Sequence, residues 1–129
     1  MRKSKIKMNT STFEWKGKAL HPFSEGRRSL ALSIGVRIFN PKVTEEQRNE
    51  GLLMDCHAIL YLCAHSFETI SIGHRQPDRI WSNIMEWSEQ NVKQKDYQAE
   101  IELVGEILKD AFSERAQIVV EGGDDVAGE

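Results

Sequence analysis

The most apolar part of the chain is the stretch at residues 52–67, LLMDCHAILYLCAHSF. Read at 100° per residue, its apolar side chains recur at helical spacing and cover more than half of the circumference. One face is formed by Leu52, Cys56, Ile59, Leu60, Cys63 and Phe67, and Leu53, Leu62 and Ala64 widen it. A helix with so wide an apolar surface is normally covered on several sides. The pattern therefore predicts the central helix of a bundle.

This central helix is expected to begin before its apolar part. Thr44 and Gln47 have the spacing of a capping box, which marks the first residues of a helix. The turns that follow, EEQRNEG, are polar. We therefore expect one helix over about 45–66, with a solvated beginning and a buried end.

A shorter amphipathic helix is predicted before it, over about 25–39. Ser24 can cap its N-terminus. Its apolar stripe has i, i+4 spacing and consists of Leu30, Ile34 and Ile38, broadened by Leu32, Val36 and Phe39. Gly35 lies inside this stripe, and a glycine within a helix favours close packing or a bend.

Two further amphipathic helices are predicted after a loop at 71–76. The first covers about 77–93, with Pro77 in its first turn and a stripe of Ile80, Ile84 and Trp87 beside Trp81 and Met85. The second covers about 97–117, with Asp96 as a candidate cap. Its apolar stripe is Tyr97, Ile101, Val104, Leu108, Ala111 and Phe112, and its outward acidic face is Glu100, Glu102, Glu106, Asp110 and Glu114.

A β-hairpin is predicted at residues 12–20, TFEWKGKAL. If Lys16 and Gly17 form a two-residue turn, Trp15 pairs with Lys18, Glu14 with Ala19, and Phe13 with Leu20. Phe13, Trp15 and Leu20 then share one face that can cover a helix end. A lone hairpin is only marginally stable in water, so this one must dock on the helices or on another chain.

Length and composition fit one mainly α domain, a bundle of three to four helices with an N-terminal β-hairpin. The chain has 129 residues, of which 40% are hydrophobic and 29% charged. We expect a domain at 12–117, a disordered basic arm at 1–11 and a flexible acidic tail at 118–129. The apolar runs are shorter than the roughly 20 residues of a membrane span, and no signal peptide is recognised. A soluble, cytoplasmic protein without a membrane partner is expected.

Charge is distributed unevenly along the chain. Residues 1–50 carry eleven Lys or Arg against five Glu, a net of +6, whereas residues 51–129 carry six against fifteen acidic residues, a net of −9. This polarity favours head-to-tail association or an intramolecular match over uniform nucleic-acid binding, and ordinary solvated surface charge is an equal alternative. The basic arm, with Arg2, Lys3, Lys5 and Lys7, leaves a contact with nucleic acid as the alternative, although four charges neutralise few phosphates.

The cysteines and histidines near the centre do not predict a metal site. Cys56 and Cys63 lie about 10.5 Å apart along a helix axis, while His57 and His65 project from other angles. Zinc ligands must converge on one ion, and a disulfide needs Cα atoms within about 7 Å. We expect reduced core thiols, a partly exposed stripe of His57, Tyr61 and His65, and no metal or cofactor.

No catalytic motif is recognised either. The sequence contains no phosphate-binding glycine loop, no HExxH and no nucleophile elbow. Cys63 has no histidine at a spacing that gives hydrogen-bond reach within a helix. We therefore expect a protein that is not an enzyme.

Aromatic side chains are the candidates for protein contact. Trp15, Trp81 and Trp87, together with Phe13 and Leu20, can belong to the core or present a partner-binding surface. The polarised charge and the two polar ends of the chain favour interaction over catalysis. These five residues are our predicted protein-interaction residues.

The order of these parts resembles the tail assembly chaperones of long-tailed bacteriophages. The similarity lies in FEWKGKAL followed by PFS, the helical segment AILYLC, the tryptophan-containing RIWSNIMEW and the acidic, glycine-containing end. It implies a non-catalytic protein of the host cytoplasm that forms homo-oligomers, binds the tape-measure protein and recruits tail-tube subunits. Some phages also make a longer, frameshifted version. The alternative is a virion connector or packaging component that contacts DNA through the basic arm.

Overall fold

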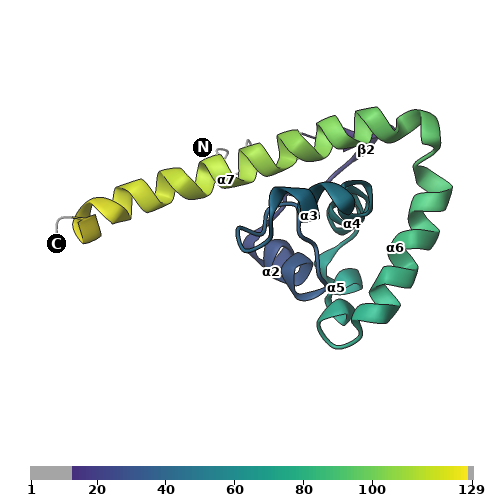
Figure 1. The fold of residues 1–129 in the computed structure, drawn as a ribbon, viewed down its shortest axis with the longest axis horizontal. Coiled ribbons are helices and arrows are strands. Elements are labelled where there is room, and N and C mark those ends of the chain that lie inside the picture. Colours follow the sequence, from purple (N-terminus) through teal and green to yellow (C-terminus); the bar gives the residue numbers. More distant parts are fainter. Residues whose placement is uncertain (1–12, 128–129) are drawn as a thin grey trace, which may run out of the picture.

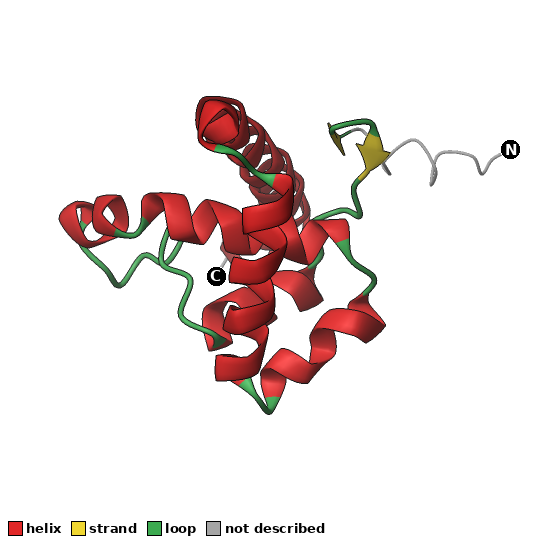
Figure 2. Cartoon of the chain, turned by 90° about the vertical axis from the view of Figure 1, so that its right-hand side faces the viewer, coloured by secondary structure: helices red, strands yellow, loops and turns green. Residues whose placement is uncertain are grey.

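The computed structural model describes residues 13–127, with side chains described as far as Phe112. This part contains six α-helices and a two-stranded antiparallel hairpin (Figure 1, Figure 2). The elements are β1 (Glu14–Trp15), β2 (Lys18–Ala19), α2 (Glu25–Ser33), α3 (Glu45–Glu50), α4 (Leu52–Ala64), α5 (Phe67–Ile70), the 3₁₀-helix η1 (Ser71–His74), α6 (Pro77–Asn91), the 3₁₀-helix η2 (Gln94–Asp96) and α7 (Tyr97–Ala127). The predicted class, mainly α with an N-terminal hairpin, is confirmed.

Helix α4 is the centre of the fold, as its pattern predicts. All residues from Asp55 to Cys63 are buried, and α4 packs mainly against α7 and α6 and also against α2. In Figure 1, α6 and α7 meet at an angle, and α2, α3, α4 and α5 lie within it. The apolar surface of α4 is thus covered from several directions, which explains why it has no polar face.

Helix α2 ends at Ser33, so the predicted end at residue 39 is wrong. Gly35 adopts φ +100°, a left-handed conformation that glycine tolerates best. The N–H of Gly35 donates to Leu32 O, and the N–H of Val36 donates to Ala31 O. These two bonds form a Schellman motif, which satisfies the last carbonyls of the helix and ends it.

Gly35→Ala and Gly105→Ala are expected to change stability in opposite directions. No heavy atom lies within 4 Å of the position that a Cβ would take at either glycine, so the backbone decides. An alanine at position 35 would have to adopt the left-handed φ of Gly35, which should lower the free energy of unfolding by about 1–2 kcal/mol. Gly105 lies inside α7, where alanine should raise it by about 0.5–1 kcal/mol. Urea denaturation of both variants checks this, and a shift in the same direction would contradict it.

The helix predicted over 45–66 is two helices, α3 and α4, separated at Gly51. The predicted capping box is confirmed, because Thr44 and Gln47 exchange side-chain and main-chain hydrogen bonds. At the break, the guanidinium of Arg37 occupies the position where a side chain at residue 51 would begin, so the packing there favours glycine. The loop predicted at 71–76 is also largely helical, since η1 continues directly from α5.

The two C-terminal helices follow the prediction at their beginnings. Pro77 stands at the start of α6, as predicted. Helix α7 continues to Ala127, so the helix end predicted near 117 is wrong, while the flexibility predicted for 118–129 stays a prediction. Extending an existing helix requires no new nucleus, which favours continuation. Residues 128–129 and the predicted basic arm at 1–11 lie outside the described residues.

The hairpin has the predicted register. Glu14 pairs with Ala19 and Trp15 with Lys18, and the N–H of Leu20 donates to Phe13 O. Both turn residues, Lys16 and Gly17, have positive φ, which matches the twist of a two-residue hairpin.

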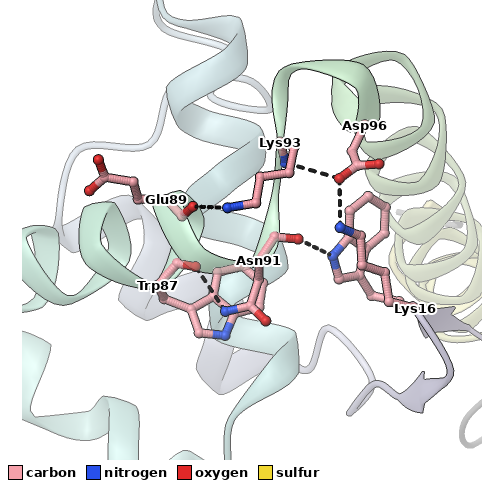
Figure 3. Close-up of polar contacts among 7 residues, drawn as sticks. Lys16, Trp87, Glu89, Asn91, Lys93 and Asp96 are labelled. Atoms are coloured by element: carbon pink, nitrogen blue, oxygen red, sulfur yellow. Dashed lines mark hydrogen bonds and ion pairs between the residues drawn. The ribbon is translucent and has the colours of Figure 1, made fainter.

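The hairpin docks where α6 leads into α7 (Figure 3). Trp15 Nε1 donates to Asn91 O at 3.1 Å, and Lys16 Nζ lies 2.6 Å from Asp96 Oδ2. Asp96 precedes α7, but its carboxylate accepts the N–H of Lys93 instead of serving the α7 N-terminus. The hydrogen bond from Lys16, followed by that from Lys93, lowers the pKa of Asp96. The hairpin is thus fixed to the helices at both a buried and an exposed point.

Candidate functional site: a cavity beside a buried histidine–glutamate pair

A cavity of about 460 Å³ opens where α4, α6 and the start of α7 meet. We call it the three-helix cavity. Its lining residues are His57, Met85, Glu86, Ser88, Glu89, Val92 and Tyr97. Helix α4 contributes His57, α6 contributes Met85, Glu86, Ser88 and Glu89, and Tyr97 begins α7. Polar and apolar side chains therefore meet around one volume that is large enough for a small ligand.

The cavity borders a buried ion pair or hydrogen bond between His57 and Glu100. His57 Nδ1 lies 2.7 Å from Glu100 Oε2, and the side chains are only 7% and 0% exposed. The ring of Tyr97 lies against the imidazole, with 5.8 Å between the ring centroids. The carboxylate fixes the orientation of the imidazole, because one ring nitrogen is committed to it.

Both partners contradict the sequence-based expectation. Glu100 is assigned to the outward acidic face of α7 and His57 to a partly exposed stripe that also includes Tyr61, yet all three are buried. Glu100 lies three residues after Tyr97 and four before Val104, so it belongs to the face that packs on α4. Its position in the helix, and not its charge, decides its burial.

Ser88 is a residue that the sequence analysis does not identify. It continues the buried series of Ile80 and Ile84 at four-residue spacing and is 4% exposed. Its Oγ has no hydrogen-bond partner among the residues described, and neither has Glu100 Oε1. Buried polar atoms are normally paired, so the unpaired hydroxyl of Ser88 in the cavity wall indicates a place that can accept a ligand or water.

The residue types serine, histidine and glutamate are those of a hydrolytic triad, but the geometry is not that of one. Activation of a serine nucleophile requires a hydrogen bond to the histidine. Ser88 Oγ makes no such bond. The arrangement offers polar atoms to a ligand and does not offer an activated nucleophile.

Cys56 and Cys63 are both fully buried, as expected of core thiols. Burial, reinforced at Cys56 by the carboxylates of Glu100 and Asp55, raises the pKa of each thiol to about 12. Because the thiolate is the reactive form, neither cysteine is placed for nucleophilic chemistry. Among the described residues, no group of three or more His, Cys, Asp or Glu side chains could hold a metal ion.

The thiols are expected not to react with Ellman's reagent in the folded protein at mildly alkaline pH. Both are buried, and raised pKa values keep them protonated. After denaturation in guanidinium, both should react, which the released thionitrobenzoate measures by absorbance. Rapid reaction of either thiol without denaturant would show that α4 is more accessible than its packing indicates.

The five predicted protein-interaction residues are divided between two places. Trp15, Leu20 and Trp87 line a cavity of about 320 Å³ between the hairpin and the helices. Phe13 packs on the core nearby, whereas Trp81 lies apart and donates its Nε1 hydrogen to Ile34 O at 2.7 Å. Trp15 and Leu20 are buried, so in this structure they belong to the core. Their role in binding a partner stays a prediction, and Arg2, Lys3, Lys5 and Lys7 lie outside the described residues.

Trp81 lines an open groove on the surface of α4 and α6, which we call the methionine groove. Its residues are Met54, Asp78, Trp81, Ser82 and Met85, and its volume is about 530 Å³. Met54 and Met85 are 40% and 42% exposed. Since Met85 lines both, the groove adjoins the three-helix cavity.

Comparison with protein-family models, curated proteins and solved structures found no match. The fold and the site together describe a small helical domain with a docked hairpin, an apolar groove and a polar cavity. Between residues 13 and 127, no helix is both long and apolar enough to cross a membrane.

Proposed function

We propose that the chain is a non-catalytic assembly protein that binds an amphipathic helix of a partner protein in the methionine groove. The observation that carries this proposal is the exposure of Met54 and Met85, which both line the groove. Methionine side chains are flexible and polarizable, so they adapt to varied apolar partners. Amphipathic helices commonly bind by placing their apolar face in such a groove.

The charge around the groove favours a partner helix with basic flanks. Asp78 lines the groove, and Glu86 follows Met85 on the adjoining cavity. Carboxylates at the rim attract Lys or Arg side chains and fix the direction in which a helix lies. We therefore assign the groove to an apolar helix face bordered by basic residues.

The specific function we propose is that of a tail assembly chaperone of a long-tailed bacteriophage. Its partners would be the tape-measure protein, whose helices would occupy the groove, and the tail-tube subunits, with self-association of the chain in the host cytoplasm. Support comes from the resemblance in the order of parts and from a groove suited to helical clients. The genomic surroundings offer an inexpensive check: a slippery run before the stop codon and a long helical reading frame downstream are expected.

The binding test compares the wild-type protein with a Met54→Gln/Met85→Gln variant for capture of helical segments of that downstream protein. Both methionines are exposed, so the double variant should fold, and circular dichroism checks this. Loss of two apolar contacts of roughly 1 kcal/mol each should weaken capture by about ten-fold or more. Phe67→Gln is the control, because Phe67 is equally exposed, at 40%, but lies on α5 outside the groove.

Three outcomes would contradict this function. If the groove variant captures the segments as well as the wild-type protein does, the groove is not the binding site. A strictly monomeric protein that binds no tape-measure segment would contradict the chaperone role. A salt-dependent shift of DNA that is lost on deletion of residues 1–11 would instead favour the connector or packaging alternative.

A further inference from the structure

We infer that the three-helix cavity binds a cationic nitrogen group, either an alkylammonium or a guanidinium. The inference rests on the charge, the hydrogen-bonding atoms and the apolar wall of this cavity. It goes beyond the proposed function, because it requires no helix in the methionine groove.

The cavity is negatively charged whichever protonation state the histidine adopts. Glu86 and Glu89 line it, and Glu100 contacts the lining residue His57. Two carboxylates thus line the cavity together with one imidazole, whose own partner is a third carboxylate, so the net charge stays negative even when the imidazole carries its second proton. Lys93 lies nearby, but its Nζ donates to the main-chain oxygen of Glu89, and Lys93 is not among the described residues that line the cavity. A cation is attracted to this place, and an anion is repelled.

The polar atoms of the cavity can accept hydrogen bonds. Ser88 lines the cavity beside the carboxylates of Glu86 and Glu89, and its buried Oγ has no partner among the described residues. An unsatisfied buried acceptor is unfavourable, so a donor that reaches it stabilises the complex. An ammonium carries three donors and no acceptor, and a guanidinium carries five. A water molecule could satisfy the hydroxyl but would leave the negative charge unbalanced.

The remaining wall suits the carbon chain that carries such a group. Met85, Val92 and the ring of Tyr97 provide apolar surface beside the carboxylates. Aliphatic stems of amines and guanidines pack on apolar side chains while the charged end reaches polar atoms. The face of a tyrosine ring also attracts a cation directly. The volume of about 460 Å³ accommodates a chain of several carbons.

The first test titrates the full chain with n-butylammonium while NMR follows the amide chemical shifts of His57, Ser88 and Tyr97. Saturable shifts confined to this region are expected. n-Butanol, which has the same carbon chain without charge, should bind about ten-fold more weakly or worse. Butyrate should not bind. Equal binding of butylammonium and butanol would overturn the inference, because the charge would then have no role.

The second test uses variants of the lining. Glu86 and Glu89 are exposed, so Glu86→Gln/Glu89→Gln should fold and should bind butylammonium about five- to ten-fold more weakly. Ser88→Ala removes one acceptor and should weaken binding by a few-fold. Glu102→Gln is the matched control, because Glu102 is exposed on α7 outside the cavity. If Glu102→Gln weakens binding as much as the double variant does, binding depends only on the general surface charge, and the inference is overturned.

The third test separates the two sources of such a group. Putrescine represents a free amine, and a capped Ala–Lys–Ala tripeptide represents a basic side chain of a partner protein. Tighter binding of putrescine would identify a small-molecule site, and tighter binding of the peptide would identify an anchoring site for a protein. Absence of binding by butylammonium, putrescine and the peptide would overturn the inference, even if the methionine groove binds its helix.

Discussion

Replacement of His57 with leucine is expected to lower the free energy of unfolding by about 4 kcal/mol, the largest loss that we expect of any single substitution in the chain. The substitution leaves Glu100 fully buried without the imidazole that now lies 2.7 Å from its carboxylate. A buried carboxylate without a partner is strongly unfavourable. Its other oxygen is already unpaired among the described residues, so no second bond compensates.

A double-mutant cycle checks the cause of this effect. Glu100→Leu alone should cost about 3 kcal/mol, because the buried imidazole loses its partner. His57→Leu/Glu100→Leu removes both polar groups and should be clearly more stable than the sum of the two single losses predicts, as for other buried pairs replaced by apolar residues. Urea denaturation of the four proteins measures the interaction energy. Strictly additive losses would show that the two side chains do not stabilise each other.

Replacement of Arg27 with methionine is expected to lower the free energy of unfolding by about 3 kcal/mol. Arg27 is buried, and its Nε and Nη2 donate to Leu62 O and His65 O at 2.7 and 2.8 Å. The carbonyls in the last turn of a helix have no partner within the helix. Methionine fills similar space but leaves these two carbonyls without the guanidinium.

The charge of Arg27 suits its position in spite of its burial. Burial lowers the pKa of Arg27, which reflects the cost of placing a cation away from water. The negative end of the α4 dipole and the two carbonyl oxygens offset this cost. Arg27→Lys should therefore recover only part of the stability, since an ammonium lacks the planar fork that reaches both oxygens.

The control is Arg28→Met at the neighbouring position. Arg28 is half-buried, and its Nη1 lies 3.5 Å from Glu25 Oε2 in an exposed pair. Such pairs contribute about 1 kcal/mol or less, so the loss should be much smaller than that of Arg27→Met. Thermal or chemical unfolding measures both variants. Equal losses would mean that the contacts of Arg27 with the end of α4 do not stabilise the fold.

Local signals in the sequence are sufficient for the beginnings of α2 and α3 and for the hairpin register. Ser24 and the Thr44–Gln47 box cap the helices that they are predicted to cap, because a cap depends on residues three positions apart. The turn at Lys16 and Gly17 sets the pairing of the strands for the same reason. The stripe of α4 predicted its central position, since only a covered helix is apolar on most sides.

The helix ends and the candidate site were predicted less well. Gly35 favours close packing or a bend within a predicted helix, but the sequence does not show that it adopts the left-handed conformation that ends α2. Glu100 and Ser88 are polar, so their residue types favour exposure, whereas their positions on apolar stripes lead to burial. A polar residue at a position where the helical spacing predicts an apolar one is the signal in the sequence that indicates a buried polar group. The pairing of His57 with Glu100, which are 43 positions apart, depends on how α4 packs against α7 and is not encoded locally.

The docking of the hairpin has a consequence for the order of folding. The bond from Trp15 to Asn91 joins residues 76 positions apart, so it closes one of the longest loops in the described chain. Closing a long loop loses chain entropy before the contacts that it forms contribute stabilising free energy. Contacts within and between neighbouring helices close shorter loops and can form earlier. We therefore expect the hairpin to be the last element to join the helices during folding and the first to leave them during unfolding.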